Sequence, residues 1–108
     1  MTMDPEAFDR LAALRHADVA PFTGDRFRVV NPDDGGSLVL VDVPDLSRPG
    51  DAERFRPPFA MVFEEPGAER PRAQGIHVLE HATLGVLPLF LVPVGPGDTG
   101  PRYEASFH

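Results

Sequence analysis

Two histidines at a spacing of four, His77 and His81, are the first side chains to consider for chemistry. On a helix, this spacing would bring both imidazole rings to one metal ion. Residues 75–81 instead have the pattern of a strand, where positions four apart lie roughly 13 Å from each other. The sequence also contains no cysteine. We therefore expect no metal site, a His81 that hydrogen-bonds near a turn and a His77 on a solvent-exposed face.

Other reactive side chains lack the neighbours that catalysis needs. Ser106 and His108 share a strand face, but no aspartate is placed to orient the histidine, and the sequence has no nucleophile elbow. The acidic pairs at positions 33–34 and 64–65 fall in loops, where solvated carboxylates are the usual arrangement. The sequence therefore predicts no catalytic residue and no cofactor.

Tyr103 and Glu104 are adjacent in a predicted strand, so their side chains point to opposite faces. A buried Tyr103 needs a hydrogen-bond partner for its hydroxyl group. Glu104 then points outward, and we expect it within reach of an arginine such as Arg102 or Arg56.

The composition indicates one folded domain, residues 1–108, because 42% of the residues are hydrophobic. All ten basic residues are arginine, and the net charge is -7. An acidic surface with scattered arginines is unsuited to binding nucleic acid. There is no basic and apolar leader and no apolar run of about 20 residues, so we expect a cytoplasmic protein when synthesised, without membrane insertion.

The chain begins with a helix signal. Asp4 is placed to cap the helix and Pro5 to occupy its first position. Phe8 and Leu11 then follow at helical spacing, and the helix is predicted to end near His16. Residues 1–20 are accordingly a short helix and a connector.

The rest of the chain, residues 22–108, has the alternation of apolar and polar residues that is typical of strands. The predicted strands are 26–30, 37–43, 59–63, 75–81, 86–94 and 102–107, with loops between them that are rich in proline and glycine. About six short strands with regular turns indicate an all-β fold, either a small antiparallel barrel or a sandwich, with a short N-terminal helix.

A series of motifs in residues 22–107 resembles a family of short bacterial proteins of unknown function. The matching positions are Phe22, Gly24, Phe27, Val29, Leu38, Leu40, Val43, Pro58, Phe59, Phe63, Gln74, Gly75, His81, Leu84, Gly85, the segment LFLVPVGP at 89–96, Tyr103, Glu104, Ala105 and Phe107. The chain departs from the family at His77, where the family has tyrosine, and at 64–65, where it has a more neutral pair. The resemblance implies a structural or assembly role, because members accompany phage-tail-like and tail-collar proteins.

Residues 86–94 are apolar on both faces of the predicted strand. One face carries Val86, Phe90, Val92 and Val94, and the other carries Leu87, Leu89 and Leu91. Both faces must therefore leave water or form an exposed patch. Pro88 and Pro93 cannot donate ladder hydrogen bonds, which predicts an edge strand or a strand with bulges. The second face is covered by the N-terminal helix, by another part of the same domain, or by another chain.

These observations favour a non-enzymatic structural or assembly protein that binds itself or a phage-tail-like partner through this apolar strand. The candidate interface residues are Leu87, Leu89, Phe90, Leu91, Val92, Pro93, Phe8 and Leu11. Two alternatives remain open: a small-ligand-binding β-barrel, and a small metal-dependent enzyme. The enzyme would require His81, Glu104 and an arginine to converge in one cleft.

Overall fold

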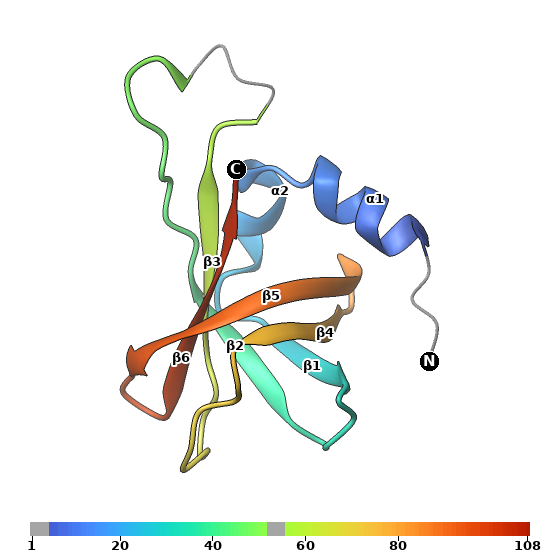
Figure 1. Ribbon diagram of the computed structural model, residues 1–108, viewed down its shortest axis with the longest axis vertical. Coiled ribbons are helices and arrows are strands. Elements are labelled where there is room, and N and C mark those ends of the chain that lie inside the picture. Colours follow the sequence, from blue (N-terminus) through green and yellow to red (C-terminus); the bar gives the residue numbers. More distant parts are fainter. Residues whose placement is uncertain (1–4, 52–55) are drawn as a thin grey trace.

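Each stretch of alternating residues becomes a strand in the computed structural model, which describes residues 5–51 and 56–108 (Figure 1). The elements in chain order are helix α1 (Pro5–Ala13), helix α2 (His16–Val19), the 3-10 helix η1 (Ala20–Phe22), β1 (Arg26–Asn31), β2 (Ser37–Asp42), β3 (Phe59–Glu64), β4 (Gly75–His81), β5 (Gly85–Pro96) and β6 (Pro101–Phe107). Val29 and Leu38 are examples of the buried positions that alternate with exposed or half-buried ones.

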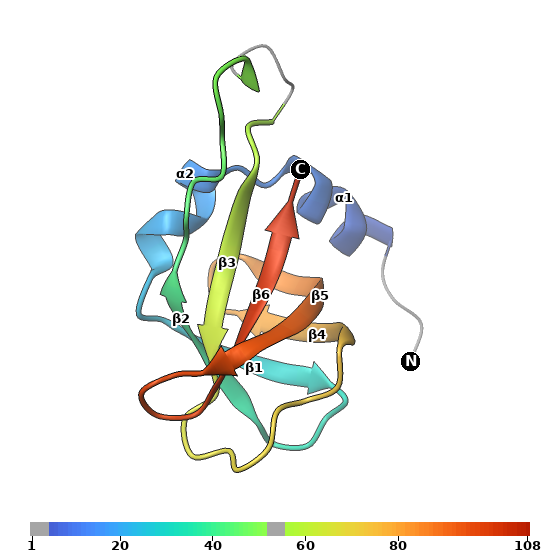
Figure 2. The same ribbon diagram turned by 60° about the vertical axis from the view of Figure 1, so that its left-hand side comes forward.

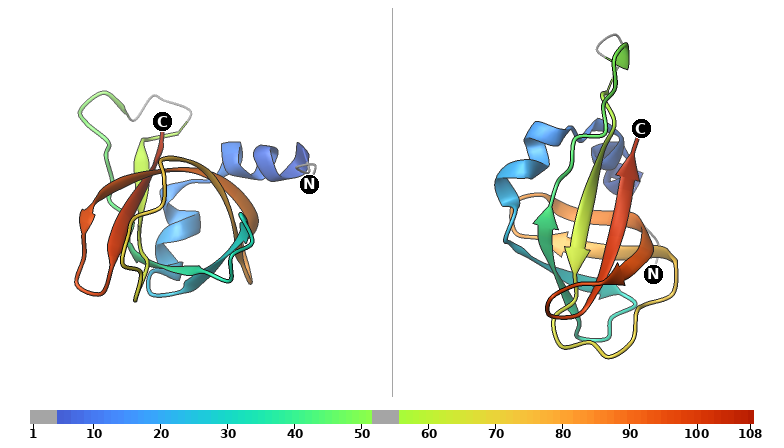
Figure 3. Two further views of the ribbon diagram at one scale, coloured as in Figure 1. Left: turned by 60° about the horizontal axis from the view of Figure 1, so that its bottom comes forward. Right: turned by 90° about the vertical axis from the view of Figure 1, so that its left-hand side faces the viewer.

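The six strands form a closed antiparallel barrel in the order β1-β2-β3-β6-β5-β4. The β1–β4 ladder closes the ring, which Figure 3 (left) shows from the barrel end. The tightest connection joins β4 to β5, where His81 pairs with Gly85 across three residues. Gly85 has a φ of 78°, a left-handed conformation that favours glycine. The predicted all-β class, with about six strands and a short N-terminal helix, is confirmed.

The barrel interior is filled by aliphatic and aromatic side chains from all six strands. The largest of them are Tyr103, Phe27, Phe59, Phe63, Leu38, Leu40, Met61, Leu79, Leu87, Leu89 and Leu91. The three leucines of β5 therefore lie inside the barrel, and the face of β5 that turns outward is the one that carries Phe90. Of the covers predicted for the leucine face, another part of the same domain is confirmed, because closure of the sheet buries these leucines within the barrel.

The two prolines of β5 fit a barrel strand because β5 changes its partner along its length. Gly85 to Leu91 pair with β4, whereas the pairing with β6 begins only at Val92. Pro93 lies next to a shift of register in the β5–β6 ladder. The bulge predicted from the prolines is confirmed, and the closed ring gives β5 a neighbour on each side.

The N-terminal segment forms two helices where one was predicted. The first, α1, ends at Ala13, and α2 begins at His16; Asp4, the predicted cap, lies outside the described residues. Val19 of α2 joins the barrel core, together with Leu14. The other helix, α1, lies outside the barrel and contacts β5 (Figure 2). No helix in residues 5–51 and 56–108 combines the length and apolar character needed to cross a membrane.

Candidate functional site

Both ring nitrogens of His81 are occupied by hydrogen bonds. Nε2 lies 2.8 Å from Oδ2 of Asp25, and Nδ1 accepts the backbone N–H groups of Thr83 and Leu84 at 3.1 Å each. Because Nδ1 accepts hydrogen bonds, Nε2 carries the proton and donates a hydrogen bond to the carboxylate of Asp25. The predicted hydrogen bonding of His81 near a turn is confirmed. With both nitrogens engaged, the ring has none left for a metal or a substrate proton.

His77 is buried, so its predicted place on a solvent-exposed face is wrong. Odd-numbered residues of β4 face the barrel interior, and Nδ1 of His77 lies 3.1 Å from the carbonyl oxygen of Gly75. Within residues 5–51 and 56–108, no group of three or more His, Cys, Asp or Glu side chains is arranged to hold a metal ion.

The other residues considered for catalysis have separate partners. Ser106 Oγ donates to Oε1 of Glu104 at 3.0 Å. Its partner is therefore a carboxylate of the same strand and not His108. Arg102 and Arg56, expected near Glu104, bind elsewhere. The structure therefore does not bring His81, Glu104 and an arginine to one place.

The acidic pair at 64–65 is not a solvated loop pair, because both carboxylates are bound by arginines. Glu64 is only 5% exposed and accepts from Nε of Arg102 at 2.7 Å. It also accepts from the N–H of Thr99 at 3.0 Å and from the hydroxyl group of the same residue. The Thr99 hydroxyl, followed by Arg102, lowers the pKa of Glu64 to about 2.

Glu65 and Asp34 bind the guanidinium of Arg72 from two sides. Oε2 of Glu65 lies 2.7 Å from Nη2, and Oδ2 of Asp34 lies 2.8 Å from Nη1. Tyr103 completes this cluster: its hydroxyl group accepts the N–H of Arg72 at 2.8 Å and donates to Glu65 at 3.0 Å. The predicted need of a buried Tyr103 for a polar partner is confirmed, and its burial raises its pKa. The cluster holds the β3–β4 loop against β6, so we assign it a structural role.

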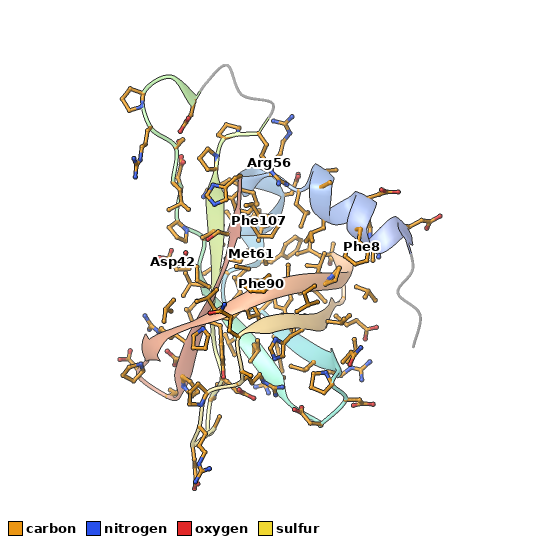
Figure 4. The ribbon with its side chains drawn as sticks, viewed as in Figure 1. Phe8, Asp42, Arg56, Met61, Phe90 and Phe107 are labelled. Atoms are coloured by element: carbon orange, nitrogen blue, oxygen red, sulfur yellow. The ribbon has the colours of Figure 1, made fainter. Side chains whose placement is uncertain are left out.

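A cleft of about 360 Å³ lies between α1 and the barrel. We call it the outer cleft; the residues that define it are Phe8 and Leu11 of α1, Ile76 of β4, Phe90 of β5, Phe107 of β6, and Arg56. Figure 4 shows Phe8, Phe90 and Phe107 around this space and Arg56 at its upper end. Phe8, Ile76 and Phe90 are 46%, 61% and 52% exposed, which is unusual for large apolar side chains so close together.

Arg56 joins α1 to the barrel at one end of the outer cleft. Its Nη1 donates to the carbonyl oxygens of Leu11, Ala12 and Leu14 at 2.8–3.1 Å, and its Nη2 donates to that of His108 at 3.2 Å. Leu11 and Ala12 belong to the last turn of α1 and Leu14 follows it, and a cation is favourable at this end of a helix. The guanidinium carbon also lies 5.4 Å from the ring centre of Phe107, within the range of a cation–π contact.

The predicted interface residues divide into two groups. Phe8, Leu11 and Phe90 line the outer cleft. Leu87, Leu89 and Leu91 belong to the barrel core, from which Leu89 also reaches the cleft, and Val92 and Pro93 pair with β6. Sequence reasoning missed Ile76 and Arg56. The alternation of β4 contains a signal for Ile76, whereas nothing local marks Arg56 in its loop.

A second recess, of about 450 Å³, lies beside the β5–β6 hairpin. Its lining includes Pro71, Pro93, Pro96, Pro101 and Glu69. Although this recess is larger, its apolar lining contains no aromatic ring and no arginine. The outer cleft combines exposed aromatic rings with a cation, so we take it as the candidate site.

Comparison with curated proteins finds no match, and neither does comparison with solved structures. The family model described as "Domain of unknown function (DUF6916)" matches residues 14–107. This match spans the whole barrel and leaves out α1. The chain therefore belongs to the DUF6916 family.

Proposed function

We propose that this protein is a non-enzymatic assembly component that binds another protein chain through the outer cleft. The observation that supports this most directly is the exposure of Phe8, Ile76 and Phe90 around one cleft. Exposed apolar groups of this kind mark interaction surfaces, and aromatic residues commonly dominate the binding energy. Complete burial of such a side chain contributes about 1.5–3 kcal/mol, so covering one that is half exposed contributes about half as much.

The partner is a second copy of this chain or a phage-tail-like protein. The resemblance described above suggests the phage-tail-like partner. Incorporation into a tail-like or exported assembly is part of the same proposal. The packed barrel interior and the separate partners of His81 and Glu104 lead us to favour protein binding over small-ligand binding or catalysis.

The test is substitution at the outer cleft with the fold preserved. Phe90→Asp places a charge on the outward face of β5, and Leu46→Asp places one at another exposed apolar position, 36% exposed. We expect the wild type and Leu46→Asp to associate in light scattering, or to co-purify with tail-like proteins, and Phe90→Asp to do neither. All three proteins should unfold at similar temperatures.

Two results would contradict this proposal. Association that is unchanged in Phe90→Asp would exclude the outer cleft. Monomers at every concentration, together with no binding to any tail-like protein, would exclude the assembly role itself.

A further inference from the structure

The ladder between β5 and β6 opens at the outer cleft. Its last pair at this end is Val92 with Glu104; the same register would place Leu91 opposite Ala105 and then Phe90 opposite Ser106, and neither pair forms. Phe90 still pairs with Ile76 of β4, and Ser106 still pairs with Ala60 of β3. The two strands therefore diverge while each stays paired with its other neighbour in the barrel, as Figure 1 shows.

The main chains of Phe90 and Ser106 face the space between the diverging strands. Arg10 Nη2, which lies outside the β4–β5 ladder, donates to the carbonyl group of Val86. The main-chain N–H and C=O groups of even-numbered residues in this part of β5 therefore point away from β4. The N–H of Ala60 donates to the carbonyl of Pro44, away from β6. Ser106 is the ladder partner of Ala60, so its main-chain N–H and C=O groups consequently point away from β3. Each strand thus presents an open edge to the cleft.

Pro88 agrees with this orientation. It occupies an even-numbered position of β5, two residues before Phe90 and in the part that has no pairing with β6. A proline is tolerated where no ladder N–H is required. The carbonyl group of Val86 accepts from Arg10, whereas in the described part of the chain no group on this side binds the carbonyls of Pro88 and Phe90 or the N–H of Phe90.

The charges around the outer cleft differ from those of the whole protein. The chain carries a net charge of -7, yet among residues 5–51 and 56–108 no aspartate or glutamate lines the cleft, whereas Arg56 does. Arg56 binds the carbonyl oxygens of Leu11, Ala12 and Leu14, which orient its guanidinium at one end of the cleft.

We propose that the outer cleft takes one extended segment of a partner protein by strand addition. The segment pairs its backbone with the open edge at Phe90 and Ser106 and presents apolar side chains to Phe8 and Phe107. Backbone pairing supplies affinity in this mode, and the alternate side chains supply specificity. The inference rests on the proposed function and adds the chemistry of the partner.

The probe is a library of random peptides displayed to the full chain. We expect enrichment of sequences with alternating apolar residues. A synthetic copy of an enriched peptide should lose about tenfold or more in affinity when one central N–H is replaced by N-methyl. No enrichment, enrichment of sequences without this alternation, or affinity that is insensitive to N-methylation would overturn strand addition.

Two variants at one position test the same edge from the protein side. Ser106→Pro removes the N–H that faces the cleft while leaving the β3 ladder its donors, and Ser106→Ala keeps that N–H. We expect Ser106→Ala to bind the enriched peptide like the wild type and Ser106→Pro to bind it at least about tenfold more weakly. Equal binding by a folded Ser106→Pro contradicts the proposal; if this variant does not fold, the N-methyl comparison decides.

The two proposals fail in different ways. If partner binding is lost in Phe90→Asp but unaffected by Ser106→Pro or N-methylation, the surface is used but strand addition is wrong. If partner binding survives Phe90→Asp, the proposed function itself is wrong.

Discussion

Glu64 is a buried carboxylate whose charge is held by neighbours distant in sequence. Thr99 and Arg102 both donate to it, and both belong to the chain that forms the β5–β6 turn and β6. Removing one partner of such a buried ion pair leaves the remaining charge buried without a counter-charge, which destabilises the fold. The side chain therefore ties the end of β3 to the turn opposite it.

The low pKa of Glu64 leads to a prediction for acid unfolding. A folded-state pKa of about 2, against an ordinary value of 4.5, means that the stabilisation is fully present above pH 4.5 and is lost as the pH falls toward 2. Asp34, whose pKa the hydrogen bond from Arg72 lowers, acts in the same direction. We expect Glu64→Gln to make the free energy of unfolding less dependent on pH between these limits.

Chemical denaturation from pH 2 to pH 6 measures this dependence. Glu80→Gln is the control, because it also removes one carboxylate of an ion pair, here an exposed one with Arg28. If Glu64→Gln and wild type lose stability equally over this interval, the charge of Glu64 does not hold the turn.

Among the elements, β5 combines a core strand with a surface strand at neighbouring positions. Leu89 is 1% exposed and Phe90 is 52% exposed, although they are adjacent in sequence. The reason is geometric, since successive side chains of a strand point to opposite faces. Its outer face supplies the candidate site and its inner face supplies the barrel core.

Substituting these two neighbours by aspartate should produce opposite outcomes. We expect Leu89→Asp to destabilise the protein by more than about 3 kcal/mol, because it removes a core side chain and buries a charge. Phe90→Asp should leave the free energy of unfolding nearly unchanged. Circular dichroism with denaturant titration measures both variants. Equal losses of stability would show that the outward face is also part of the core.

The helix α1 is short and depends on its contacts with the barrel. A nine-residue helix is marginal in isolation, so its docking has to stabilise it. The contacts include the buried Ala7, the hydrogen bond from Arg10 to Val86, and the bonds from Arg56 to carbonyls in and just after the last turn of the helix.

We expect Arg56→Met to release α1 while the barrel remains folded. Amide hydrogen exchange should show faster exchange for α1 and unchanged protection of β3 and β6, because the three carbonyl bonds are lost but the core is not. Arg48→Met, in the same loop, is the matched control. Unchanged exchange of α1 in Arg56→Met would show that the apolar contacts of the helix suffice.

For the molecule as a whole, closure of the sheet determines which surfaces are available for binding. A closed ring leaves few exposed backbone edges, and closed barrels avoid edge-to-edge association in this way. Here the ring is complete in its strand order but parts locally between β5 and β6. The helix α1 and Arg56 lie at that opening. At the candidate site, an open edge and an apolar surface therefore meet.

The local sequence pattern was sufficient to predict the strands and the turns. The alternation at Phe59, Met61 and Phe63 predicts β3, and the Pro-Gly-rich turn at 96–101 predicts the β5–β6 hairpin; both are present. These signals are local, because side-chain alternation and turn conformation depend on neighbouring residues alone. The burial of Tyr103 and the turn hydrogen bonds of His81 followed from the same reasoning.

The faces and the long-range partners required the tertiary structure. Both faces of β5 are apolar, so alternation separates Leu89 from Phe90 but does not say which one points inward. Arg72 and Asp34 are 38 positions apart, and Arg56 reaches α1 across a similar separation. Only the closing of the barrel puts these groups in contact. The sequence by itself determined the strands, the turns and the all-β class, because these depend on local periodicity. The tertiary structure determined which residues line the outer cleft, because a strand has an inner and an outer face only once the sheet has closed.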